Sequence, residues 1–148
     1  MRKPDIRTGP RHPRIAAAGY EITRRLSERA LASRGLHKVN GEFAQATIAS
    51  IRERLQRGET IYIAGLACPG THNTGVALVE VTQKDGPRLI VNNEEERFSG
   101  NKHTNEFPQH ALDDMRKVLR RMGRDIGDVA AFVTTWDYPA LLPMLIRT

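Results

Sequence analysis

Apolar residues recur along this chain with two different periods, and the period changes at Thr60. Before that residue the spacing is helical and predicts helices over about residues 14–33 and 42–57. Gly35 and Gly58 lie where a left-handed cap would end each helix. The predicted apolar stripes are Ile15, Ile22, Leu26 and Ala30 in the first helix, and Phe43, Thr47, Ile51 and Leu55 in the second.

Strand-like runs follow Thr60, separated by short connections rich in Gly and Pro. Two short connections in succession predict an antiparallel meander. A helical run that opens at Pro108 follows the third strand. The predicted order is β-β-β-α-β-α, over about residues 61–67, 75–81, 88–92, 108–122, 129–134 and 140–146.

This order predicts an α/β fold. An antiparallel three-strand start, followed by a helical crossover to a further strand, opens a half-domain of the actin-like or ribonuclease-H-like type. We therefore expect a partial actin-like ATPase half-domain over residues 59–148, preceded by a basic, partly disordered extension of two helices over residues 1–58. The complete unit normally adds at least one more strand, so we expect the core to be truncated.

Charge is distributed unevenly between these two regions. Residues 1–58 hold 13 Lys+Arg and 5 Asp+Glu, whereas residues 59–148 hold 10 and 12. A basic helical pair is compatible with a module that binds nucleic acid or an acidic partner on a degenerate scaffold. It is also compatible with a solvated helical face, and the near absence of interleaved aromatic residues makes nucleic acid the less favoured partner.

Composition also bears on the compartment. No run of 18 apolar residues is present, so the sequence predicts no membrane span. The charged start is not followed by an apolar signal core, and the single cysteine, Cys68, fits a reducing cytosol. We therefore expect a cytoplasmic protein.

The first candidate site is the loop that joins the first two strands, Pro69–Gly75. A turn rich in Gly, Thr and Asn exposes backbone N–H groups and hydroxyls that suit phosphate oxygens. His72 adds an imidazole, a group that in general can exchange a proton near neutral pH. An ordinary hairpin loop with an exposed histidine has the same composition, so both interpretations remain open on spacing alone.

The second candidate site is the charged stretch Asn93–His103, which contains three consecutive glutamates. Three adjacent carboxylates cannot all be buried without partners, and Arg97 is placed to neutralise one of them. In an extended segment Glu94 and Glu96 would lie on one side and Glu95 on the other. A solvated charge run before a helix is the alternative interpretation.

Metal binding is not predicted from these residues. His103 and His110 are seven positions apart with no cysteine nearby, so no ligand set with zinc spacing is present. Lys102, by contrast, is suited to bind a phosphate or carbamoyl oxygen as a point charge.

Residues 65–128 resemble a known family in the order and spacing of five short motifs. The family comprises the O-carbamoyltransferases of nodulation-factor and antibiotic biosynthesis, the NodU/CmcH family, and the similarity is to its amino-terminal portion. The motifs are Gly70-Thr71-His72-Asn73, Val76-Ala77-Leu78-Val79, Glu94-Glu95-Glu96-Arg97-Phe98-Ser99, Lys102-His103 and Phe107-Pro108.

The resemblance implies a domain of the actin-like ATPase superfamily, related to the catalytic core of tRNA threonylcarbamoyl transferases. A second domain, similar to threonylcarbamoyl-adenylate synthases, is implied after it. Members use carbamoyl phosphate and ATP to form a carbamoyl-adenylate, and then pass the carbamoyl group to a substrate hydroxyl. The implied cofactors are thus ATP and a divalent metal (Fe or Mg). The implied partners are carbamoyl phosphate, a small-molecule hydroxyl acceptor and the remainder of the polypeptide. The metal ligands are implied beyond residue 148, so this chain is not expected to be active alone.

The resemblance also implies roles for individual residues. His72 is expected to act as base on the acceptor hydroxyl or to orient the carbamoyl group. Lys102 is expected to stabilise negative charge on the carbamoyl or phosphate oxygens. Glu96 is expected to support these residues rather than to touch substrate. Substrate binding is implied for Gly70, Asn73, Arg97 and His103.

Overall fold

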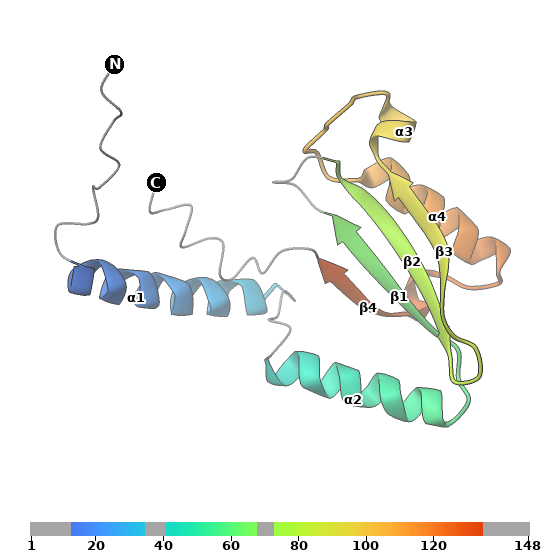
Figure 1. Cartoon of the computed structure of the whole chain (residues 1–148), viewed down its shortest axis with the longest axis horizontal. Coiled ribbons are helices and arrows are strands. Elements are labelled where there is room, and N and C mark those ends of the chain that lie inside the picture. The colour runs from blue at the N-terminus through green and yellow to red at the C-terminus, as the bar shows by residue number, and fades with distance from the viewer. Residues whose placement is uncertain (1–12, 35–40, 68–72, 135–148) are drawn as a thin grey trace, which may run out of the picture. The chain divides into compact units, whose positions relative to one another are not determined.

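The computed structural model describes residues 13–34, 41–67 and 73–134 (Figure 1). The chain divides into two compact units, of which the first is Met1–Gly41 with Trp136–Thr148, and its described part is chiefly helix α1 (Pro13–Ala32). The second, Glu42–Thr135, is called the sheet unit below. It contains α2 (Glu42–Gln56), β1 (Ile61–Ala67), β2 (Gly75–Thr82), β3 (Gly86–Glu94), α3 (Glu96–Ser99), α4 (Gln109–Arg121), the short 3-10 helix η1 (Ile126–Asp128) and β4 (Val129–Thr134).

The predicted helices and strands up to residue 134 are confirmed, with small shifts at their ends. The predicted last helix, 140–146, lies outside the described residues, as do residues 1–12 of the predicted disordered start. Among the helices that the structure describes, none combines the length and apolar character needed to cross a bilayer.

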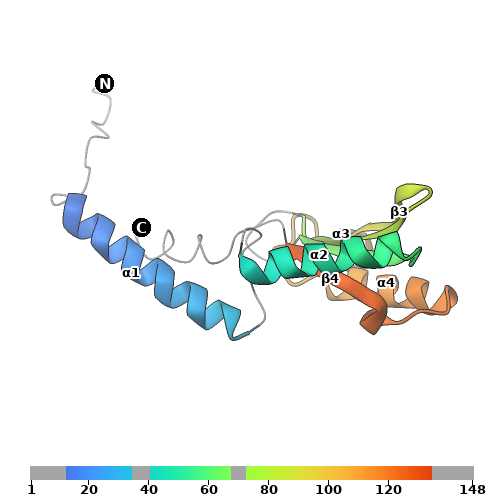
Figure 2. The same ribbon diagram turned by 90° about the horizontal axis from the view of Figure 1, so that it is seen from below.

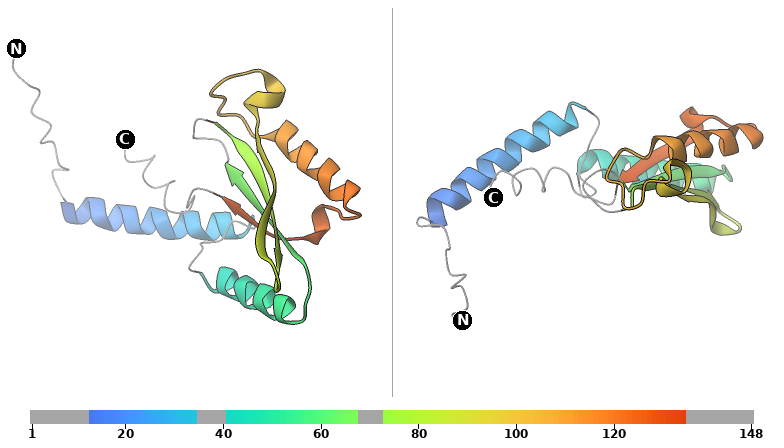
Figure 3. Two further views of the ribbon diagram at one scale, coloured as in Figure 1. Left: turned by 45° about the vertical axis from the view of Figure 1, so that its right-hand side comes forward. Right: turned by 90° about the horizontal axis from the view of Figure 1, so that it is seen from above.

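The four strands form one mixed sheet in the order β3-β2-β1-β4. The first three strands pair antiparallel, which confirms the predicted meander, and β4 pairs parallel with β1. A parallel pair needs a crossover connection, which α4 and η1 provide here. The sheet unit is therefore a mixed α/β fold, and Figures 2 and 3 show α4 along one face of the sheet.

The core lies between α4 and this face. Ala64, Leu78 and Val91 are neighbours in one row across β1, β2 and β3, and each is at most 6% exposed. Met115 and Leu119 pack against them from α4 and are fully buried. The buried residues of α4 recur at helical spacing and so form one face, which packs on these strands.

Helix α2 belongs to the sheet unit rather than to the unit of α1. Its end is fixed to the start of β1 because Arg54 and Arg57 both donate hydrogen bonds to Glu59, at 2.8 and 3.0 Å. The stripe predicted for α2 is only partly buried, and Phe43 is 59% exposed. The domain boundary predicted after residue 58 remains a prediction.

We expect Leu78→Ala to lower the free energy of unfolding by about 2–5 kcal/mol, because it removes a fully buried side chain and leaves a cavity. Leu89→Ala is the matched control, since Leu89 on the neighbouring strand is 59% exposed and should change stability by about 0.5 kcal/mol or less. Urea unfolding of both variants measures the difference. Equal losses would contradict this assignment of the core.

Candidate functional site

The two motif-bearing segments lie at the same end of the sheet. Ala67, at the end of β1, pairs with Gly75, which starts β2, and Gly75 pairs in turn with Glu94 at the end of β3. The end of β1, the start of β2 and the end of β3 therefore lie in one row at this end of the sheet. Glycine is required at position 75, because a Cβ there would lie 2.6 Å from the Asn93 carbonyl oxygen.

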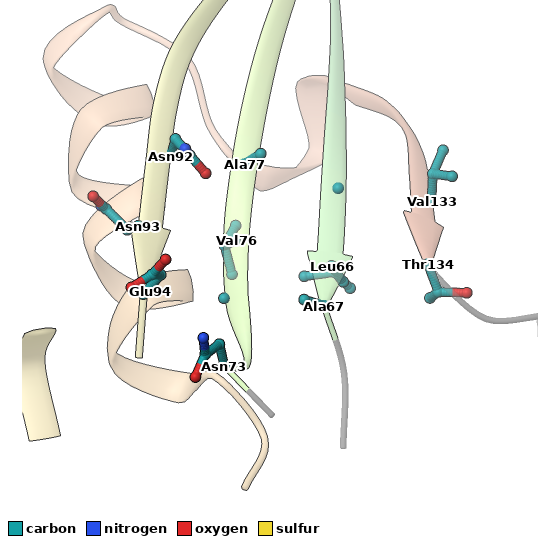
Figure 4. Close-up of a pocket in the computed structure, with 12 residues that line it drawn as sticks. Leu66, Ala67, Asn73, Val76, Ala77, Asn92, Asn93, Glu94, Val133 and Thr134 are labelled. Carbon is teal, nitrogen blue, oxygen red and sulfur yellow. The ribbon is translucent and has the colours of Figure 1, made fainter. Parts of the chain in front are cut away.

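A pocket of about 460 Å³ occupies this end of the sheet (Figure 4). Its floor includes a row that crosses all four strands through Val133, Gly65, Ala77 and Asn92. This row is one residue away from the buried row that packs on α4, so alternation along the strands places it on the opposite face. A second row on that face consists of Ala67, Gly75 and Glu94.

Small residues make the pocket, and β3 makes its polar wall. Gly65 and Ala77 leave space in the middle of the floor, where larger side chains would fill it. Asn92 and Glu94 line the pocket from β3, and Val133 lines it from β4 on the other side of these small residues (Figure 4). The pocket therefore offers amide and carboxylate groups on one side and an apolar surface on the other.

Asn73 connects the pocket to the loop between α3 and α4. Asn73 lines the pocket, and its Oδ1 lies 3.1 Å from His103 Nδ1. Both residues have left-handed backbone, with φ of 64° and 55°, and they are the only non-glycine residues with positive φ in the described chain. This conformation costs a non-glycine residue about 1 kcal/mol or more, so the surrounding structure must hold it in place.

Glu96 supports His103 from α3. The Glu96 Oε2 atom accepts a hydrogen bond of 3.2 Å from the His103 backbone N–H. Arg97, one residue further along α3, lies 3.9 Å from Glu94, which confirms that it pairs with one of the glutamates. Both partners are partly exposed, so this ion pair contributes little to stability.

Glu95 is the buried member of the three glutamates, with 3% of its surface exposed. Its Oε2 accepts a hydrogen bond of 2.9 Å from the Ala111 backbone N–H, and its Oε1 accepts one of 3.2 Å from that of His110. The same Oε1 contacts the His110 imidazole at Nδ1. Glu95 thus caps α4 from a distance, because Pro108 at the N-cap position makes no side-chain hydrogen bond.

The pKa of the Glu95 carboxyl lies below its usual value. Burial alone would raise this pKa, but the hydrogen bonds from Ala111 and His110 favour the carboxylate and outweigh the burial. On its other side, the Glu95 backbone N–H donates a hydrogen bond of 2.9 Å to the Thr74 carbonyl oxygen. One residue therefore joins the end of the first loop, α3 and the start of α4.

The extended arrangement predicted for the three glutamates is wrong. β3 ends at Glu94, and Glu95 already has helical backbone angles, with φ −59° and ψ −36°. Glu96 therefore lies in α3 and not on the same side of a strand as Glu94. The backbone turns because the Glu95 carbonyl accepts hydrogen bonds from the N–H groups of Phe98 and Ser99, both at 3.0 Å.

The remaining predicted site residues are only partly placed. Lys102 is exposed in the turn after α3 and is not among the described residues that line the pocket. Gly70 and His72 lie outside the described residues, so their roles remain predictions. The structure thus brings together four of the predicted residues around the pocket and the α3–α4 loop: Asn73, Glu96, Arg97 and His103.

Three contributors were missed from the sequence: Asn92, the small residues of the floor, and Glu95 as a helix cap. Glu95 had one signal, because the predicted helix opens at Pro108 without Ser, Thr, Asp or Asn at its start. A helix without its own cap needs an acceptor from elsewhere. Asn92 had no such signal, since its neighbours in the pocket are set by strand register.

The described part of the chain contains no group of residues suited to bind the metal or the ATP that the resemblance implies. Within residues 13–34, 41–67 and 73–134, no three His, Cys, Asp or Glu side chains lie close enough to hold a metal ion. The described lining of the pocket has no lysine or arginine and includes Glu94, so it does not fit a triphosphate.

The basic charge of the described helices is partly compensated locally. Arg24 forms ion pairs with Glu21 and Glu28 on α1, and Arg25 lies 3.4 Å from Glu21. Cations that are already paired release less free energy on contact with phosphates. These pairs weaken the case for a nucleic-acid module, which otherwise remains untested.

Comparison of the chain with protein-family models, with curated proteins and with solved structures finds no match. A functional assignment therefore rests on the motifs, the pocket and the contacts described above.

We expect Glu95→Gln to lower the free energy of unfolding by about 1–3 kcal/mol at neutral pH, since a neutral amide replaces a buried carboxylate that accepts backbone hydrogen bonds. The folded-state pKa of Glu95 lies below its usual 4.5, so its contribution is present above that pH. It is lost as the pH falls through the folded-state pKa. Urea unfolding from pH 7 to pH 3 measures this difference, with the exposed Glu106→Gln as control. A pH-independent difference would contradict the capping role.

Proposed function

We propose that this chain is the amino-terminal part of an O-carbamoyltransferase of the NodU/CmcH family, and that the sheet unit is part of an actin-like, ribonuclease-H-like half-domain. The strand order β3-β2-β1-β4, with three antiparallel strands and a helical crossover to a parallel fourth, supports the fold. One fold can carry many different activities. The topology therefore supports the actin-like, ribonuclease-H-like fold class but does not assign an activity.

One observation carries the proposed activity. Asn73 from the first motif and Glu94 from the third line the same pocket, and His103 from the fourth motif contacts Asn73. These residues are up to 30 positions apart in the sequence. A solvated charge run would not need to meet the hairpin loop, whereas a binding site requires this convergence.

The polar groups of the pocket suit a carbamoyl group. Such a group has an N–H₂ donor and a carbonyl acceptor, and the Asn73 and Asn92 side chains present both kinds of partner. Glu94 offers a further acceptor for the N–H₂. The small floor at Gly65 and Ala77 leaves room for a planar group against the sheet.

In the proposed reaction the acceptor hydroxyl oxygen attacks the carbamoyl carbon of a carbamoyl-adenylate. The bond from that carbon to the phosphate oxygen breaks and AMP leaves. The hydroxyl proton passes to a histidine of this site, for which the resemblance nominates His72. Lys102, in the exposed turn after α3, is proposed to stabilise charge on the leaving phosphate. Formation of the adenylate is assigned to the polypeptide beyond residue 148.

We expect carbamoyl phosphate to shift the backbone amide NMR signals of Asn73, Glu94 and His103, because Asn73 and Glu94 line the pocket and His103 contacts Asn73. The measurement is a titration of the ¹⁵N-labelled chain. Inorganic phosphate at equal concentration is the control for simple anion binding, and Lys84, in the hairpin at the other end of the strands, is the internal reference. Equal shifts with phosphate, or shifts scattered over the surface, would contradict a carbamoyl site.

We expect His72→Ala and Lys102→Ala each to lower carbamoyl transfer by about 10²-fold or more, because each removes a group that acts in the transition state. The assay uses the transferase assembled from this chain and the polypeptide that follows it, with mass detection of the carbamoylated acceptor. Lys84→Ala is the matched control for loss of an exposed lysine. Unchanged turnover in both variants would exclude these two residues from the reaction.

A further inference from the structure

The contact between Asn73 and His103 determines more than the position of a loop. His103 Nδ1 lies 3.1 Å from the amide oxygen of Asn73. An amide oxygen only accepts hydrogen bonds, so Nδ1 must carry a proton to make this contact. In a neutral imidazole the other nitrogen, Nε2, then carries the lone pair.

Both residues are held from outside the contact. The residue after Asn73, Thr74, is fully buried, and its carbonyl oxygen accepts the Glu95 N–H at 2.9 Å. The backbone N–H of His103 donates to Glu96, and the following Thr104 is 5% exposed. These anchors hold the two left-handed backbone positions from which the exposed side chains make the 3.1 Å contact.

We propose that Asn73 is a positioning residue that fixes the neutral tautomer of His103 with the proton on Nδ1, and that His103 Nε2 accepts the proton of the acceptor hydroxyl. The tautomer assignment depends only on the Asn73 contact at Nδ1. The catalytic role rests on the proposed function. It assigns the role of base to His103 and leaves His72 the other role that the resemblance implies, which is to orient the carbamoyl group in the transition state. The proton leaves the hydroxyl for Nε2 while the hydroxyl oxygen bonds to the carbamoyl carbon and AMP departs.

The arrangement follows a general pattern for proton transfer by histidine. A base is effective when a second group holds its ring and selects the nitrogen that carries the lone pair. Asn73 meets this requirement and also lines the pocket, so the residue that would orient the base is in the same cavity as the proposed substrate.

The tautomer is tested on the 148-residue chain by two-bond ¹H–¹⁵N correlation spectra of the His103 ring, recorded at about pH 9. We expect the Nδ1–H pattern in the wild type. Asn73→Gly keeps the left-handed backbone without strain but removes the acceptor, and should shift His103 toward the Nε2–H form. Asn73→Asp keeps an acceptor oxygen and should restore the Nδ1–H form.

The control for a glycine in this region is Asn101→Gly, an exposed asparagine in the same loop that should leave the His103 pattern unchanged. Unchanged signals from the buried Met115 show that each variant is folded. An Nε2–H pattern in the wild type, or the same pattern in the wild type and Asn73→Gly, would overturn the tautomer assignment.

The catalytic role has a separate readout in the assembled transferase. Asn73→Gly should lower kcat by about tenfold or more with little change in the KM for the hydroxyl acceptor, and Asn73→Asp should recover most of kcat. Unchanged kcat in Asn73→Gly together with the expected tautomer shift would overturn His103 as the base. A wild-type assembly without transferase activity would overturn the proposed function, and with it the catalytic role, while the spectra still decide the tautomer.

Discussion

The Glu95 carboxylate is the interaction on which the site end of the sheet unit depends. Helix α4 begins at Gln109 after a proline that makes no side-chain cap, so its first backbone N–H groups need an external acceptor. Glu95 supplies it from the end of β3 and is almost completely buried in doing so. Because its backbone N–H is also bound to Thr74, one residue holds the start of β2, α3 and α4 in a single arrangement.

This anchor leaves the neighbouring residues on β3 for the pocket. The strand directs Asn93 toward α4, where its amide donates a hydrogen bond of 2.9 Å to Asp114, and it directs Asn92 and Glu94 to the opposite face. At the end of β3, a residue that contacts α4 therefore lies between two residues that face the pocket. The close approach of Gly75 to the Asn93 carbonyl keeps β2 and β3 in the register that this division requires.

Sequence patterns predicted the parts of the fold that depend on local spacing. Apolar runs bounded by Gly- and Pro-rich connections located the strands, and helical spacing located α4, whose Met115 and Leu119 pack on them. The pattern did not show which glutamate is buried, since the partners of Glu95 lie 15 and 16 residues away. Asn92 was missed for a related reason, because only the register between β2 and β3 places it beside Ala77.

The charge of the pocket constrains how a carbamoyl-adenylate would lie under the proposed function. Such a ligand has a neutral carbamoyl end and an anionic phosphate. The phosphate is disfavoured beside the Glu94 carboxylate, whose counter-charge among the described residues is the exposed Arg97 at 3.9 Å. The carbamoyl end can share the pocket with Glu94 because its N–H₂ group donates to a carboxylate. The polar wall on β3 therefore favours the orientation that leaves the phosphate toward solvent, where Lys102 is exposed, and keeps the carbon under attack near the residues that Asn73 organises.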